Sequence, residues 1–141
     1  MQHIIIYTDG GARGNPGPAG IGVQILDEEG KTLKEFGEYI GEQTNNVAEY
    51  TALIRALQEL LKLFGPRLRE MQVEVRADSE LMVRQMSGVY KVKEPTLKEL
   101  FGQAAKLKMD GVPNLIFTHV RREKNVRADE LVNEAIDKHA L

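Results

Sequence analysis

The sequence lacks the residues on which several classes of protein site depend. Its 141 residues include no cysteine and no tryptophan, and only four tyrosines and four phenylalanines. Without cysteine there can be no disulfide bond, thiolate zinc site or cysteine nucleophile. No apolar run approaches the roughly 20 residues that a membrane-spanning helix needs, so we expect no membrane partner.

A signal peptide and a strong excess of charge are also missing. Residues 1–7 are too short for a secretory signal and lack its basic start, so we expect a cytoplasmic protein. The net charge is −2. Any contact with nucleic acid must therefore depend on local basic clusters rather than on the charge of the whole molecule.

What is present is typical of one globular domain. Hydrophobic residues make up 42% of the chain and charged residues 28%. No repeat, low-complexity tract or linker divides the sequence, so residues 1–141 are expected to form a single domain. No obligate protein partner is indicated, and we expect a monomer.

The hydrophobic pattern predicts an α/β fold. Strands are expected at residues 3–8, 20–26, 31–40, 72–77 and 115–120, and helices at 46–64, 79–86, 96–109 and 125–139. Three consecutive strands followed by alternating helices and strands indicate one mixed sheet with helices on both faces. Right-handed crossovers would place the fourth and fifth strands parallel to the first.

Four acidic residues occupy unusual places in this pattern. Asp9 and Asp78 directly follow the first and fourth expected strands. If those strands are parallel neighbours, both carboxylates lie at one edge of the sheet, where α/β proteins tend to bind ligands. Glu49 and Asp129 lie on the apolar stripes of their helices, where a carboxylate is costly unless it is paired or coordinated.

Each acid also has an ordinary explanation. Asp9 can end a strand before two glycines, Asp78 can cap the helix that follows it, Glu49 can belong to a capping box, and Asp129 can be a first-turn helix acid. Four acids meeting at one edge are better explained by a metal site, because bound cations remove their mutual repulsion.

The chemistry of such a site follows from its ligands. An all-oxygen set favours Mg²⁺ or Mn²⁺ over Zn²⁺. Four carboxylates suffice for two ions about 4 Å apart, an arrangement suited to in-line displacement at a phosphorus atom. No serine or cysteine nucleophile motif competes with this interpretation.

Four segments resemble the motifs of a known family. They are residues 7–11 (YTDGG) with 14–17 (GNPG), 44–50 (TNNVAEY), 77–79 (ADS) and 125–131 (NVRADEL). In this order they are similar to the motifs of type 1 ribonuclease H, and together they span nearly the whole chain.

The resemblance implies a fold and an activity. The fold would be ribonuclease H-like, a five-stranded mixed sheet whose first three strands are antiparallel, with helices on both faces. The activity would be endonucleolytic hydrolysis of the RNA strand of RNA–DNA hybrids, leaving 5′-phosphate and 3′-hydroxyl ends. Asp9, Glu49, Asp78 and Asp129 match the catalytic metal ligands of the family, which would hold two Mg²⁺ ions, with Mn²⁺ as a substitute.

The resemblance also implies substrate contacts. Asn15, Asn45 and Asn46 match positions that contact the hybrid, and Thr44 matches one near a DNA-strand phosphate. Glycines such as Gly11 would let the backbone approach the minor groove. Alternatively, Asn45 and Asn46 are a helix-capping pair, and the glycines belong to an ordinary flexible turn.

The chain departs from the family pattern in two places. Some members grip the hybrid with a long basic insertion, but the segment 87–93 is short here. Lys91 and Lys93, beside Tyr90, are candidates to contact phosphate and sugar, or they belong to a solvated loop.

Many members carry a histidine in a loop before the last catalytic acid. Residues 121–124 are too few for that loop and include no histidine, and His119 is expected within the fifth strand. A basic cluster that begins with Arg121 and Arg122 is a candidate for phosphate contacts, or it is a solvated entrance to the last helix.

Other functions remain open from the sequence. The same site could act on double-stranded RNA, or the chain could be a catalytically silent module that binds nucleic acid. The fold also supports transposase, integrase and resolvase chemistry, but no additional DNA-binding domain is visible.

Overall fold

The computed structural model describes residues 2–140. The strands are β1 (Gln2–Ala12), β2 (Gly17–Asp27), β3 (Thr32–Gln43), β4 (Met71–Ala77) and β5 (Leu115–His119). The helices are α1 (Asn45–Phe64), α2 (Glu80–Met86), α3 (Pro95–Gly111) and α4 (Val126–Ala140), with 3₁₀ turns η1 (Gly65–Glu70) and η2 (Arg122–Lys124). The predicted order of elements is therefore confirmed.

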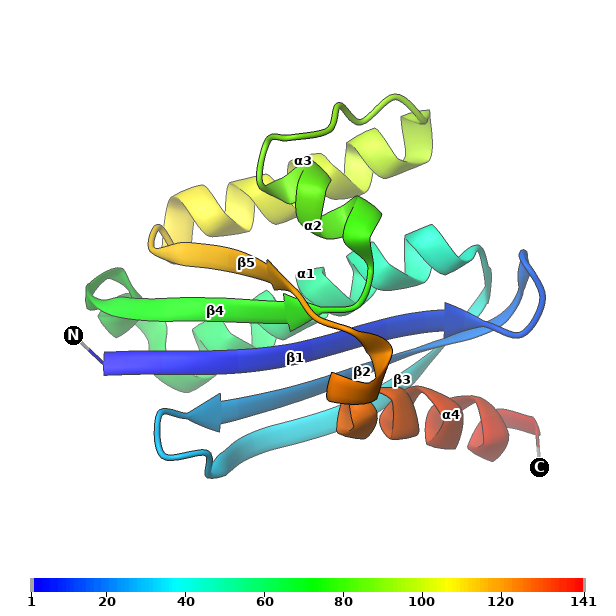
Figure 1. Ribbon diagram of the computed structural model, residues 1–141, viewed down its shortest axis with the longest axis horizontal. Coiled ribbons are helices and arrows are strands. Elements are labelled where there is room, and N and C mark those ends of the chain that lie inside the picture. Colours follow the sequence, from blue (N-terminus) through cyan, green and yellow to red (C-terminus); the bar gives the residue numbers. More distant parts are fainter. Residues whose placement is uncertain (1, 141) are drawn as a thin grey trace.

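The strands form one five-stranded mixed sheet in the order β3-β2-β1-β4-β5 (Figure 1). The pairs β1–β2 and β2–β3 are antiparallel, whereas β4 pairs parallel with both β1 and β5. The α/β class and the antiparallel first three strands agree with the prediction. Among residues 2–140, no helix is long and apolar enough to cross a membrane.

Helices cover the sheet unequally (Figure 1). Strand residues alternate between the two faces, so Val23 and Ile25 of β2 join Ile4 and Ile6 in the core beneath α1. The intervening residues of β2 point to the other face, which α4 crosses. The helix α3 packs outside α1.

The main difference from the sequence prediction is the length of β1. Residues 9–11 were expected to break the strand, but the pairing with β2 continues through Asp9↔Gly22 to Ala12↔Ala19. The neighbouring strand supplies hydrogen bonds that outweigh the local turn preference of Asp-Gly-Gly. Asp9 therefore lies within β1 and does not follow it.

The ends of other elements also shift by a few residues. The strand β2 begins at Gly17 and β3 extends to Gln43, because their outer ends pair with each other. Helix α2 begins at Glu80, since Ser79 is its N-cap and accepts a hydrogen bond from the Met82 amide at 3.2 Å.

Candidate active site

The site begins where β1 and β4 part. The last paired residues of the two parallel strands are Thr8 and Ala77. Asp9 is the next residue of β1, and Asp78 is the first residue after β4, so the strand register places them side by side. Sequence reasoning predicted this juxtaposition correctly, although it placed Asp9 outside the strand.

Glu49 reaches the site because α1 lies directly on β1. A Cβ atom on Gly10 would lie 2.2 Å from the Ala48 carbonyl carbon, so only glycine permits this approach. The Gly10 amide donates a 3.0 Å hydrogen bond to Glu49 Oε1. The capping-box interpretation of Glu49 is wrong, because the N-cap of α1 is Thr44, whose hydroxyl accepts from the Val47 amide.

Asp129 is carried to the site by α4, which packs on a second glycine surface. A Cβ on Gly22 would lie 2.1 Å from the Ala128 carbonyl oxygen, and one on Gly37 would lie 2.5 Å from the Leu131 carbonyl oxygen. The absence of side chains at these positions lets the first turns of α4 lie against β2 and β3. Asp129 is a first-turn acid, as its ordinary explanation held, and it also lines the cleft that contains Asp9.

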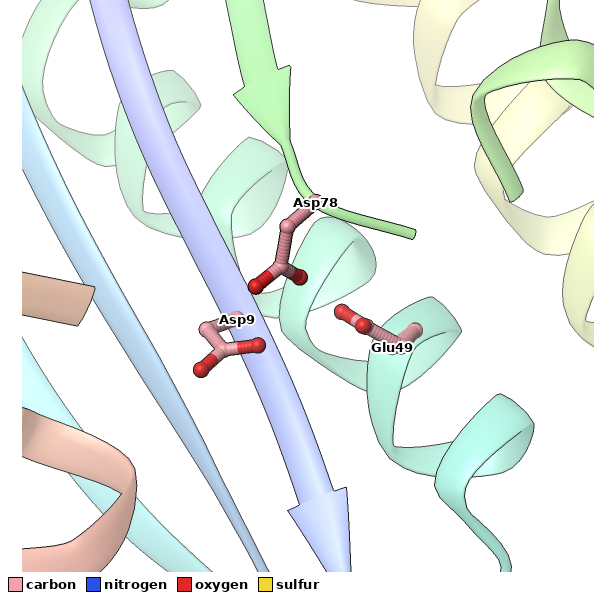
Figure 2. A group of neighbouring side chains, drawn as sticks. All are labelled: Asp9, Glu49 and Asp78. Atoms are coloured by element: carbon pink, nitrogen blue, oxygen red, sulfur yellow. The ribbon is translucent and has the colours of Figure 1, made fainter. Parts of the chain in front are cut away.

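Three of the carboxylates form a tight group (Figure 2). Asp9, Glu49 and Asp78 each offer an oxygen atom within 4.8 Å of the others, and Figure 2 shows their carboxylates turned toward one another. Asp129 is not within this trio, but it lines the same cleft, and its charge contributes to raising the pKa of Asp9. The predicted convergence of four acids is therefore present in the structure.

The group strongly disfavours its own negative charge. Burial, together with the charges of Asp78 and Asp129, raises the pKa of Asp9 from 3.8 to about 8. Burial and the charge of Asp9 raise the pKa of Glu49 well above its ordinary value. Clustered carboxylate oxygens with raised pKa values form a donor set that fits divalent cations, which would replace the shared protons.

The carboxylates line a cleft of about 350 Å³. Its other lining residues are Gly10, Gly11, Ala12, Arg13, Asn45, Arg122, Val132, Asn133 and Ile136. Of the predicted substrate residues, Gly11 and Asn45 belong to this lining.

Asn15 and Asn45 link the rim of the cleft together. Asn45 Oδ1 accepts from the Ala12 amide at 2.9 Å, and Asn15 Oδ1 accepts from the Asn45 amide at 2.9 Å. Thr44 caps α1 directly beside them. Both side-chain amides therefore have their oxygens engaged within the protein, which leaves their NH₂ groups as donors at the rim.

Other predicted substrate residues lie outside the lining of the cleft. Asn46, Lys91, Lys93 and Arg121 are exposed, and none of them is among the residues that line it. Within the basic cluster before α4, it is the next residue, Arg122, that faces the cleft, with its Nε atom 4.0 Å from Asp78 Oδ2.

Arg13 was not predicted from the sequence. It lines the cleft and binds α4 through Asp137 Oδ1 at 2.6 Å and Asn133 Oδ1 at 3.2 Å. These partners are more than a hundred residues away in the chain, so no local pattern indicates the contact.

Comparisons with known proteins agree with this geometry. A family profile described as reverse transcriptase-like matches residues 7–135. A structure of LC11-RNase H1, isolated from compost by a metagenomic approach, is 71% identical, with a TM-score of 0.95 over the whole of both chains. The chain belongs to the type 1 ribonuclease H family.

Other ribonuclease H structures share the fold at lower identity. The RNase H1 of the halophilic archaeon Halobacterium salinarum is 40% identical, with a TM-score of 0.87, over 96% of this chain and 98% of that one. The N-terminal RNase H domain of Rv2228c from Mycobacterium tuberculosis is 40% identical, with a TM-score of 0.88, over 99% and 97% of the two chains.

Two of the curated relatives are longer than this chain. It spans 36% of the length of the bifunctional protein Rv2228c and 63% of that of the Halobacterium ribonuclease HI, at 42% and 41% identity. The predicted membership of the ribonuclease H family and the predicted ribonuclease H-like fold are confirmed.

Proposed function

We propose that this chain hydrolyses the RNA strand of RNA–DNA hybrids at the cleft of Asp9, Glu49, Asp78 and Asp129, leaving 5′-phosphate and 3′-hydroxyl ends. The observation that carries the proposal is the meeting of these carboxylates at the point where β1 and β4 part. Support for the substrate comes from LC11-RNase H1, which was crystallised in complex with an RNA/DNA hybrid and is 71% identical to this chain.

Two Mg²⁺ ions are proposed to bind between the four carboxylates, with Mn²⁺ as a substitute. Bound there, such ions would offset the charge of a scissile phosphate and make a water molecule more acidic. The protein's own contribution is to hold four acids together in a partly buried cleft despite their repulsion. Charged groups that the fold holds in place in this way need less reorganisation during a reaction.

The amides at the rim are proposed to recognise the hybrid. Since the Oδ1 atoms of Asn15 and Asn45 accept protein amides, their NH₂ groups can donate to acceptors on the nucleic acid. Such donors can bind 2′-hydroxyl oxygens, which distinguish RNA from DNA, without requiring one base sequence. Lys91, Lys93 and Arg121 would then act outside the cleft, on more distant phosphates.

A cleavage assay tests this function. We expect Mg²⁺-dependent cutting of the labelled RNA strand in an RNA–DNA hybrid, and no cutting of a DNA duplex of the same sequence. Cutting of a matched RNA duplex would extend the substrate range, and binding without any cutting would overturn the proposal in favour of a silent binding module. We also propose that the protein acts as a monomer, which sedimentation can test.

A further inference from the structure

One buried side chain outside the carboxylate group connects the two elements that carry Asp9 and Asp129. Asn125 lies directly before α4 and is 1% exposed. Its Nδ2 atom donates a 2.8 Å hydrogen bond to the backbone oxygen of Thr8, the residue that precedes Asp9. The two residues are 117 positions apart in the sequence.

The backbone of Asn125 is equally engaged. Its amide donates to the Arg122 oxygen at 3.0 Å and closes η2, and its own oxygen accepts from the Asp129 amide at 3.1 Å. One residue therefore holds the first turn of α4 on one side and β1 on the other. On the β1 side, the bonded oxygen belongs to Thr8, the residue before Asp9. On the α4 side, the bonded amide is that of Asp129 itself.

The bond is made where the sheet itself no longer connects these parts. Thr8 is the last residue of β1 in register with β4, because the chain turns away after Ala77. Beyond that point, on the β4 side, β1 has no strand to fix its position. The amide of Asn125 binds β1 there.

Two polar atoms beside this bond are left without a partner within residues 2–140. Asn125 Oδ1 and Thr8 Oγ1 are buried and have no hydrogen-bond partner among the described residues. Buried polar atoms without a partner in the protein are uncommon, and each calls for an explanation, such as a catalytic role or a bound water molecule or ion. An apolar side chain would avoid the unpaired oxygen at position 125 but could not bind the Thr8 oxygen.

We propose that Asn125 is a positioning residue, which sets the place of Asp129 relative to Asp9 and thereby the affinity of the site for divalent cations. The inference rests on the proposed metal site and adds a residue to it that touches no metal. Groups that orient metal ligands typically change metal affinity by about 10- to 100-fold when they are removed.

The test compares Mn²⁺ binding by Asn125→Ala and wild-type protein, with free Mn²⁺ measured by electron paramagnetic resonance. We expect Asn125→Ala to bind about tenfold more weakly. In an Asp129→Asn background the same substitution should change the affinity less than about twofold, because the ligand that it positions is gone. A purely structural role would lower the melting temperature in both backgrounds and leave Mn²⁺ affinity unchanged in both.

Asn114→Ala provides a matched control. Asn114 also donates from its Nδ2 atom to backbone oxygens, those of Arg69 at 3.0 Å and Met71 at 3.4 Å, at the opposite end of β4. It should lower the melting temperature without changing Mn²⁺ affinity. An equal loss of affinity in Asn114→Ala would contradict the inference.

Two further arms keep the outcomes distinct. If Asp9→Asn binds Mn²⁺ like the wild type, the proposed metal site is wrong. If Asp9→Asn loses binding but Asn125→Ala does not, only the positioning role is wrong. Should Asn125→Ala not fold, Asn125→Ser serves instead. In the wild type, the NMR resonance of the Asn125 side-chain amide must also shift during a Mg²⁺ titration. A resonance that does not move would overturn the positioning role.

Discussion

Asp9 shows how one residue can serve binding at the expense of stability. It is 7% exposed, and burial together with the neighbouring acids raises its pKa to about 8. Without cations, the folded protein must either keep a proton on this carboxyl group or accept repulsion. Such a pattern, in which buried acids face one another within a cleft, is typical of functional sites.

Neutralising one acid should separate activity from folding. We expect Asp9→Asn or Asp78→Asn to abolish Mg²⁺-dependent hybrid cleavage while the circular dichroism spectrum stays native. At pH 8 and without metal, Asp9→Asn should also be more stable than the wild type, by about 1 kcal/mol or more, because a raised carboxyl pKa is removed. Near-normal cleavage by either variant in Mg²⁺ would count against the assignment.

The amide of Asn45 allows a finer substitution. Asn45→Asp keeps an oxygen that can accept from the Ala12 amide but removes the NH₂ donor. We expect KM for the hybrid to rise roughly tenfold, equivalent to about 1.4 kcal/mol, with little change in melting temperature. Asn45→Ala, which removes the donor and acceptor alike, should also lower the melting temperature. Unchanged KM in both variants would rule out a substrate contact.

The identities of the acids were predictable from the sequence, but their partners were not. Asp9 and Asp78 stand out because they follow expected strands, and Glu49 and Asp129 because they lie on the apolar stripes of expected helices. The bond from the Gly10 amide to Glu49 spans 39 residues, and no local pattern indicates it. Contacts of this kind depend on how the elements pack, so they require coordinates.

At the scale of elements, two helices reach the site because they pack on glycines. The helix α1 lies on Gly10, and α4 lies on Gly22 and Gly37. The sequence suggested a turn or a route to the minor groove for the glycines after Asp9. Gly10 instead lies within β1, where it pairs with Ile21 of β2 and lets α1 pack closely against the strand.

Adding one methyl group beneath α4 should displace it. In Gly22→Ala the new Cβ would lie 2.1 Å from the Ala128 oxygen, so we expect a loss of about 2–3 kcal/mol in the free energy of unfolding and impaired cleavage. Gly102→Ala in α3 is the control, since nothing lies within 4 Å of the added Cβ. It should stabilise the protein by up to about 1 kcal/mol. Equal unfolding curves for the two variants would contradict the packing role.

The helices and the strand order were predictable to within a few residues, but the extent of β1 was not. Apolar residues at alternating spacing indicate strands and those at helical spacing indicate helices, because the buried positions of each element are apolar. The end of a strand depends on its neighbour, and β2 continues to pair with β1 past Thr8. The sheet thus extends beneath the cleft, where sequence signals indicated a loop.

At the scale of the whole molecule, opposing pKa shifts should determine how stability depends on pH. The pKa of Asp9 is raised in the folded protein. Its contribution to the free energy of unfolding is therefore complete below about pH 3.8 and is lost as the pH rises toward about 8. Hydrogen bonds, first from Lys34 and then from Lys62, lower the pKa of the buried Glu59 from 4.5 to about 2. The contribution of Glu59 to the free energy of unfolding is complete above about pH 4.5 and is lost as the pH falls toward about 2.

Metal-free protein should therefore be most stable near pH 4–5 and should become less stable toward pH 8. Mg²⁺ should reverse the alkaline part of this trend, because cations replace the protons that the acids share. Urea unfolding at pH 5 and pH 8, with and without Mg²⁺, measures both effects. Glu59→Gln should flatten the acidic limb alone, and a Mg²⁺ effect of the same size at both pH values would contradict the explanation.

The most direct test is to locate the metal. Crystals of the wild-type protein soaked in Mn²⁺ at pH 8 should give anomalous density between the carboxylates of Asp9, Glu49 and Asp78, with Asp129 beside it. Crystals of Asp9→Asn should lose that density. Fully ordered carboxylates without manganese between them, in a wild-type crystal that diffracts well, would contradict the account.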